Sequence, residues 1–312
     1  MKVTKYHLID KHFISLNAQI PVEVFEVKEN KKVVHLLDPY QTVTQDILDE
    51  IEKAIALYIL KEDTFIYEDF AVSNLKKVAK TGSISFTEKA KVIMQKAEHV
   101  MDELFKNPET LGNIEELQEV VDDLVVTILD EDFTIIALMD LAAHDYYTHT
   151  HSLNVSIYAL SLGKFLGLKS EDLKDLGEAA IMHDLGKSKI KKEIINKNGK
   201  LTNFEFEYMQ NHPNWSFDIA QEMGVTDRRV LYAIKHHHEK LDGSGYPDHI
   251  RGKDISLFAR IISICDIFDA LTTRRSYKDP VSTFNTLKMM KEDMSTQVDI
   301  RLVNSFIMMM HR

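Results

Sequence analysis

Apolar and polar residues alternate near the start of the chain in the way that half-buried β-strands require. Residues Ile20–Lys28 alternate in this manner, and the short run Val33–Leu37 is rich in β-branched and aliphatic side chains. The polar residues Glu29–Lys32 between them predict a turn, so the two runs predict a β-hairpin. Further short strands are expected at Leu57–Leu60 and Thr64–Tyr67.

A helical period of three and four replaces this alternation further along the chain. Thr44 can cap a helix that extends to about Leu57. A second helical stretch is expected from Val72 to about Asn107, with an interruption at Thr81–Ser85. Apolar residues recur at helical spacing from Ile114 to about Met139. This last segment is interpreted as a core or connecting helix, and a seam between two subunits of a homodimer is the alternative.

The strongest boundary signal is Asn107–Gly112, which contains a proline and a glycine. The sequence therefore predicts three segments. Residues 1–110 form a small mixed α/β region with a regulatory or interaction role, residues 111–140 form a connecting helix, and residues 141–312 form the catalytic region. With only 11 glycines and 6 prolines, the 312-residue chain is expected to be mainly α.

Charge and cysteine content restrict the classes of function. A formal net charge of -11 argues against sequence-independent binding to DNA or RNA polymers, which needs a basic surface. The single cysteine, Cys265, excludes an intrachain disulfide and fits a reducing compartment. No signal peptide and no apolar run of membrane-spanning length is found, so a cytoplasmic protein is expected.

Histidine becomes frequent after Leu141, next to acidic residues, glycine and proline. These residues form five blocks: Asp145–Val155 with His149 and His151, His183–Asp184 with Lys187, Asn211–Pro213 with His212, His236–Pro247 with His237 and His238, and Ile261–Arg275 with Asp266. Each histidine alone is explained as well by capping or by a hydrogen bond in the core. Together the blocks favour a metal site, because several imidazoles and carboxylates arrive from separate segments.

Three positions carry specific expectations. Asp184 has two carboxylate oxygens and can bridge two cations. His212 precedes a proline, which disfavours the α conformation, so it is expected at a helix break with its side chain facing a cavity. Asp266 ends an apolar run, and a buried carboxylate needs a cationic partner. Imidazole and carboxylate ligands suit Fe, Mn or Zn better than Ca or Mg.

These blocks, in this order, resemble the HD-GYP family, a branch of the HD phosphohydrolase superfamily. The resemblance is carried by His183-Asp184, by His237-His238-Glu239, by Asp242-Gly243 and by Gly245-Tyr246-Pro247. It covers about Leu141 to Arg312 and implies an all-helical catalytic domain. It says little about residues 1–140.

The resemblance also implies a metal-ligand set. One metal would be held by His151, His183, Asp184 and Asp266, and a second by Asp184, His212, His237 and His238. Two divalent ions are expected, Fe or Mn by preference, with Zn as an alternative. Some family members hold a third metal through a glutamate four residues before the first histidine. Tyr147 stands there in this chain, which argues against a third metal, although Asp145 or His149 could compensate.

The activity implied by the resemblance is hydrolysis of the bacterial second messenger cyclic di-GMP by a metal-activated water, giving pGpG and in some cases GMP. Asp184 and Lys187 are the predicted catalytic residues. Lys187 and Arg275 would contact phosphate, and Gly245, Tyr246 and Pro247 would line the substrate site. Lys187 could instead be a helix-terminal cation. The loop could instead be a rigid turn, or a docking surface for a diguanylate-cyclase domain.

Two other functions stay open at this point. The catalytic region could be a weakly active cyclic di-GMP receptor that signals to a partner through residues 1–140. It could also be a phosphohydrolase that acts on another cyclic dinucleotide.

Overall fold

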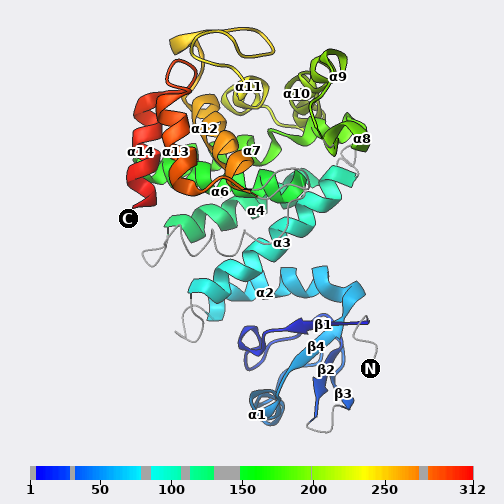
Figure 1. Cartoon of the computed structure of the whole chain (residues 1–312). Helices are drawn as coiled ribbons and strands as arrows, with labels where there is room; N and C mark the ends of the chain where they lie inside the picture. Colours follow the sequence, from blue (N-terminus) through cyan, green and yellow to red (C-terminus); the bar gives the residue numbers. More distant parts are fainter. Residues whose placement is uncertain are drawn as a thin grey trace. The chain divides into compact units, whose positions relative to one another are not determined.

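The computed structural model describes residues 5–28, 32–78, 86–106, 113–129, 148–197, 199–273 and 280–311. The chain divides into two compact units, Met1–Lys96 and Ala97–Arg312. A small antiparallel sheet lies in the first unit, and the second unit is helical wherever it has regular structure in its described part (Figure 1). The prediction of a mainly α protein is confirmed. The predicted boundaries near residues 110 and 140 lie outside the described residues and stay predictions.

The sheet of the first unit has four strands in the order β1-β4-β2-β3, with antiparallel neighbours. The strands are β1 (Tyr6–Ile9), β2 (Val24–Val27), β3 (Val33–Leu37) and β4 (Leu57–Leu60). Burial alternates along β2 and β4, so one face of these strands packs into the core. The predicted hairpin and the strand at Leu57–Leu60 are therefore present, whereas β1 was not predicted.

Three helical elements precede α2 in the first unit: η2 (Lys11–Phe13), α1 (Gln45–Lys53) and η3 (Lys61–Asp63). Thr44 caps α1 as predicted, because its Oγ1 accepts a hydrogen bond from the Ile47 amide at 3.5 Å. The helix ends at Lys53, short of the predicted Leu57. The backbone of Ala54 is already extended there and leads the chain into β4.

The strand predicted at Thr64–Tyr67 is wrong, because these residues begin α2 (Thr64–Val78). Tyr67 and Ala71 are both buried and lie one helical turn apart, so the apolar run follows a helix face. The Tyr67 hydroxyl donates to the Asp10 carbonyl at 3.1 Å, which fastens α2 to the segment after β1. A short apolar run does not distinguish strand from helix by itself.

The second unit is built from helices and short helical turns, and α3 contains the division between the units. The elements are α3 (Phe86–Lys106), α4 (Asn113–Leu129), α6 (Thr148–Phe165), α7 (Ser170–Met182), η5 (Leu185–Lys189), α8 (Lys192–Ile195), α9 (Asn203–Met209), α10 (His212–Glu222), α11 (Arg228–His236), η6 (Gly252–Asp254), α12 (Leu257–Thr272), α13 (Thr283–Glu292) and α14 (Ile300–Met310). The described part of the predicted connecting helix ends at Leu129. None of the described helices combines the length and the apolar character that a membrane crossing requires.

Helix α6 packs against α7 and α12, and also against α4 and α14. Its residues from Thr150 to Leu162 are buried. An aromatic cluster joins it to α12 and α14, with ring centroids of Tyr158 and Phe268 5.2 Å apart and those of Phe268 and Phe306 4.9 Å apart. This core fixes the helices whose ends carry the histidines.

Candidate metal centre

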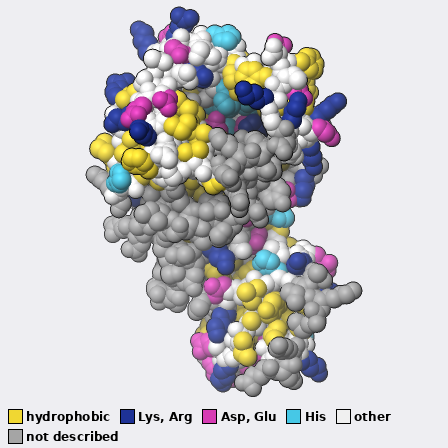
Figure 2. All heavy atoms as spheres, viewed as in Figure 1, with side chains coloured by type: hydrophobic (Ala, Val, Ile, Leu, Met, Phe, Trp, Pro, Cys, Tyr) yellow, Lys and Arg dark blue, Asp and Glu magenta, His cyan; other side chains and the backbone are white. Residues whose placement is uncertain are grey.

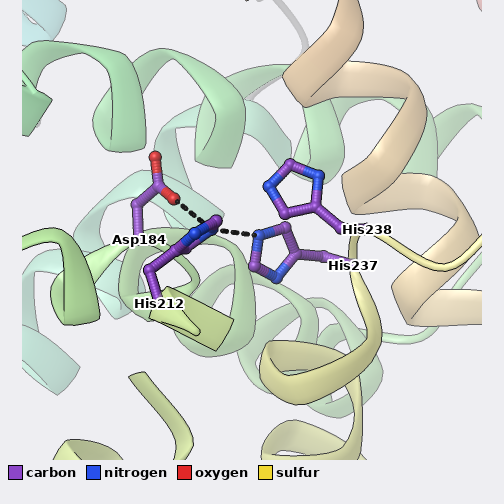
Figure 3. A group of neighbouring side chains, drawn as sticks. All are labelled: Asp184, His212, His237 and His238. Carbon is purple, nitrogen blue, oxygen red and sulfur yellow. Dashed lines mark hydrogen bonds and ion pairs between the residues drawn. The ribbon is translucent and has the colours of Figure 1, made fainter. Parts of the chain in front are cut away.

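The side chains predicted as metal ligands come together in the second unit, from five separate segments. They form two groups of possible ligand atoms, each within 4.8 Å: Asp184, His212, His237 and His238 in the first group, and His151, His183 and Asp266 in the second. Six of these side chains belong to buried residues, and His238 is half-buried. Figure 3 shows the first group, with the histidine rings and the Asp184 carboxylate directed toward one another.

Asp184 lies where the two groups meet, directly after the C-cap residue of α7. Its Oδ1 is 3.2 Å from Nε2 of His212. Its Oδ2 is 3.4 Å from Nε2 of both His151 and His183. Each oxygen of one carboxylate therefore faces a different set of imidazoles.

The histidines are oriented by hydrogen bonds on the far side of their rings. Nδ1 lies 2.6 Å from the Ala180 carbonyl in His183, 2.6 Å from the Ile234 carbonyl in His237, and 2.7 Å from the Met209 carbonyl in His212. A carbonyl only accepts, so the proton is on Nδ1 and the Nε2 lone pair points into the site. This is the orientation that a metal-ligating imidazole needs.

Asp269 orients a fourth imidazole of the site, that of His151, and the sequence did not assign it a role. Its Oδ2 lies 2.6 Å from Nδ1 of His151. Its Oδ1 accepts hydrogen bonds from Asn154 and Thr273, both at 3.0 Å. The only sequence signal for this role is the spacing of three from Asp266, which places both carboxylates on one face of α12.

His236 shows why only two of the three consecutive histidines reach the site. Its Nδ1 is 2.8 Å from the Tyr232 carbonyl, and its Nε2 is 2.9 Å from Asp248 Oδ2. Both ring nitrogens face oxygen acceptors, so neither is available to a cation. His237 and His238 follow it at the end of α11 and turn toward Asp184 and Asp266.

Burial sets the protonation of the histidines. It lowers the pKa of His237 well below the ordinary value, and the nearby His238 and His183 add to the effect. Burial also lowers the pKa of His212, and it lowers the pKa of His238 to about 3. Burial alone would raise the pKa of Asp184, but the Lys187 ammonium, His183 and His212 together outweigh it and hold this pKa well below its usual range. Neutral imidazoles and an ionised carboxylate are the forms that bind a divalent metal.

Two buried polar atoms at the centre of the site fit a cation. Within the part of the chain that the structure describes, His183 Nε2 and Asp184 Oδ1 make no hydrogen bond. A buried acceptor without a donor costs free energy, and a coordinated metal ion removes that cost. The donor set of imidazoles and carboxylates matches Fe, Mn and Zn rather than Ca or Mg.

His212 lies at the break between α9 and α10 with its side chain in the site, as predicted, but its backbone conformation corrects one expectation. It is the first residue of α10 and is followed by Pro213, so the proline does not push it out of the helix. Proline is tolerated in the first helical turn because the backbone N–H groups there have no intrahelical partner. The close approach of η5 fixes this position, since a Cβ on Gly186 would lie 2.1 Å from the His212 carbonyl oxygen.

Tyr246 and Lys187, two of the predicted substrate residues, lie beside metal ligands. The Tyr246 ring stacks on His238, with centroids 4.7 Å apart and an interplanar angle of 29°. Lys187 Nζ contacts Asp184 Oδ2. Gly245 is buried, and Pro247 follows Tyr246. Arg275, Tyr147 and Asp145 lie outside the described residues, as does the side chain of His149.

Figure 2 shows histidine side chains at the bottom of a hollow in the second unit, so imidazoles in this unit are reached from solvent. The class of HD-type metal sites is defined by three features found here: a helical fold, a hollow with histidines, and a carboxylate between two imidazole groups. Residues 137–302 match the family described as HD domain, and the chain belongs to this family, in its HD-GYP branch.

Curated relatives match part of this chain. The chain is 32% identical over 174 residues to a cyclic di-GMP phosphodiesterase of Pseudomonas aeruginosa, covering 56% of this chain and 42% of the relative. It is 41% identical over 118 residues to the cyclic di-GMP phosphodiesterase response regulator RpfG of Xanthomonas campestris, covering 36% of this chain and 30% of the relative. It is 37% identical over 153 residues to the 3'3'-cGAMP-specific phosphodiesterase 3 of Vibrio cholerae, covering 49% of this chain and 33% of the relative. The chain thus aligns with less than half the length of these relatives.

One solved structure resembles almost the whole chain. Bd1817, an HDG"Y"P protein from Bdellovibrio bacteriovorus, aligns with a TM-score of 0.69 over 98% of this chain and 100% of its own, at 20% sequence identity. At that identity the similarity establishes a shared fold.

Proposed function

We propose that the protein is a metal-dependent phosphodiesterase that hydrolyses cyclic di-GMP to the linear dinucleotide pGpG. One observation carries the proposal: Asp184 Oδ1 faces His212, whereas Oδ2 faces His151 and His183. A carboxylate with each oxygen turned to a separate set of imidazoles is suited to bridge two divalent cations. The curated relatives named as cyclic di-GMP phosphodiesterases support this choice of substrate.

We assign one cation to each donor group, with Asp184 shared. The first would be held by His151, His183, Asp266 and Asp184, and the second by His212, His237, His238 and Asp184. Fe or Mn is preferred, and Zn suits the same donors. Bound divalent ions supply Lewis acidity, which lowers the pKa of a coordinated water and offsets charge on the phosphoryl oxygens.

Other side chains would bind and orient the dinucleotide. We assign Lys187 to the scissile phosphate, because its ammonium contacts Asp184, the residue that both cations would share. We assign the Tyr246 ring to a guanine base, because a flat aromatic surface beside the ligands offers a stacking partner. Gly245 and Pro247 would shape the same wall, and Arg275 would hold a phosphate.

The test uses the full chain, purified without oxygen and loaded with Fe or Mn. Chromatography should detect pGpG from cyclic di-GMP, with GMP appearing later if a second cleavage follows. The double substitution His183→Ala with Asp184→Ala should remove bound metal and reduce turnover to background. His311→Ala, at an exposed histidine beyond α14, is the matched control and should behave as the unmodified chain. Absence of turnover in the metal-replete protein would contradict the proposal.

A second candidate substrate is 3'3'-cGAMP, because three relatives named as specific for it are 37%, 39% and 37% identical to the aligned parts of this chain. The two cyclic dinucleotides differ only in one purine base, so the metal site serves either. Comparing kcat/KM for both substrates decides between them. Tight binding of cyclic di-GMP without cleavage would instead favour the receptor function.

We propose a regulatory or interaction role for residues 1–110, which contribute none of the assigned ligands. The first compact unit, Met1–Lys96, has its own sheet and core. Docking of a diguanylate-cyclase domain, a homodimer and a cytoplasmic location stay predictions from the sequence.

A further inference from the structure

Asp248, the residue directly after Gly245-Tyr246-Pro247, makes contacts with three residues at the end of α11. Its Oδ2 accepts a hydrogen bond from Lys235 Nζ at 2.7 Å and lies 2.9 Å from His236 Nε2. Its backbone N–H donates to Glu239 Oε1 at 2.7 Å. Side chain and backbone of one loop residue are thus both fixed to the same helix end.

The same helix end carries two of the assigned metal ligands, His237 and His238. The loop returns to it at Tyr246, whose amide donates to the His238 carbonyl at 3.3 Å and whose ring stacks on the His238 ring. Asp248 is therefore the second point at which the loop is attached, two residues beyond the stacked tyrosine.

Close packing also leaves the loop little freedom in the residues just before Tyr246. A Cβ on Gly245 would lie 2.5 Å from the Glu239 Cα and from the His238 carbonyl oxygen. Gly243 has a φ of 78°, a conformation that glycine adopts without strain, and a Cβ there would lie 2.2 Å from Arg251 Nε. The loop backbone lies directly on the backbone of the helix end, so a shift of one moves the other.

The charges around Asp248 favour an ionised carboxylate. The hydrogen bond from Lys235 and the contact with His236 hold the pKa of Asp248 below its usual range. The side chain of His236 is buried, whereas that of Asp248 is 44% exposed. The buried His236 imidazole and the Lys235 ammonium thus hold the half-exposed Asp248 carboxylate in place.

We propose that Asp248 is a positioning residue that fastens the Gly-Tyr-Pro loop to the end of α11 and thereby holds Tyr246 against His238. As far as it concerns the dinucleotide, this inference rests on the proposed function. Asp248 itself does not contact any of the assigned metal ligands in the described structure, so its effect on catalysis would pass through the loop.

The first test measures hydrogen exchange of the amides between Asp242 and Asp248 in the full chain. Asp248→Ala should speed their exchange about tenfold, the effect of losing one charge-assisted hydrogen bond. The matched control is Asp254→Ala, which removes an exposed aspartate from η6 and should leave this exchange unchanged. Equal exchange in Asp248→Ala and in the unmodified chain overturns the proposal. This test does not depend on turnover, so it remains decisive if the proposed function fails.

The second test separates positioning from a general loss of structure. In Asp248→Ala, KM for cyclic di-GMP should rise about tenfold while bound metal stays at the level of the unmodified chain. Lys235→Met removes the lysine that donates to Asp248. The double variant should have the same KM as Asp248→Ala alone, because both substitutions break the same contact. Additive effects, or an unchanged KM in an active enzyme, contradict the positioning role.

Discussion

Asp269 illustrates at the scale of a single residue how a buried carboxylate orients a neighbouring imidazole and fixes its tautomer. It contacts Nδ1 of His151 at 2.6 Å, and Asn154 and Thr273 hold its other oxygen. The partner on Nδ1 decides which ring nitrogen presents a lone pair to the site. His183, His212 and His237 use backbone carbonyls for the same purpose, so His151 is the one of these four that depends on a side chain.

Asp269→Asn should therefore weaken metal binding without removing a ligand. The amide can present an N–H to His151 Nδ1, which favours the tautomer with its proton on Nε2. Affinity for Mn should fall by about 10- to 100-fold. Isothermal titration calorimetry with Mn measures this affinity. Asp218→Asn, on the exposed side of α10, is the control. An affinity equal to that of the unmodified chain would show that Asp269 does not orient His151.

At the scale of elements, the ends of helices carry both the stability and the chemistry of the second unit. Asp299 caps α14, accepting from the Arg301 amide at 3.0 Å, and it pairs with Arg260 of α12 at 2.6 Å. One carboxylate thus joins the start of the last helix to a helix that carries Asp266. Burial alone would raise the pKa of Asp299, but the hydrogen bonds and charges of Arg301, together with the charge of Arg260, outweigh it and lower this pKa.

Asp299→Asn should lower the free energy of unfolding by about 1 kcal/mol at pH 7, because the amide still caps the helix but loses the charge. The pKa is lower in the folded chain, so this stabilisation is complete above the unfolded pKa of about 4. It is lost as the pH falls through the folded pKa. Urea unfolding of both proteins between pH 7 and pH 3 should show the difference shrinking toward acid. Asp293→Asn, at an exposed aspartate, should show no such trend.

At the scale of the molecule, the site joins segments that are distant in the sequence. His151 and Asp266 come from α6 and α12, while Asp184, His212 and His237 lie at the ends or starts of other elements. In this site, imidazole nitrogens lie 3.0 to 3.8 Å from carboxylate oxygens. Cations bound there would tie the helices together, so metal binding and folding of the second unit should be linked.

Removal of metal should accordingly lower the melting temperature. At free metal 100 times above the dissociation constant, binding adds about 2.7 kcal/mol to stability, which corresponds to roughly 5–10 °C for a unit of this size. Thermal unfolding with and without a chelator measures the shift. The variant His183→Ala with Asp184→Ala should melt at the same temperature in both conditions. A chelator-independent melting temperature in the unmodified chain would contradict the metal centre.

Local signals predicted many of the elements. The Thr44 cap, the hairpin of β2 and β3, and the position of His236–His238 at a helix end follow from patterns within a few residues. The same patterns failed at Thr64–Tyr67, where a short apolar run fits a strand and a helix equally well. At His212 they were right about the break between α9 and α10 but wrong about the backbone conformation, because the first helical turn tolerates the proline that follows.

The sequence by itself determined the residue types and their order, and these were enough to predict the class of site and the set of candidate ligands. Only the tertiary structure decided that the two oxygens of Asp184 face different imidazole groups, that Asp269 orients His151, and that Asp248 is fixed to α11. The reason is physical: donor chemistry is a property of each side chain, whereas the distance between two donors depends on how distant helices pack. That packing involves the whole core around α6, which no short stretch of sequence contains.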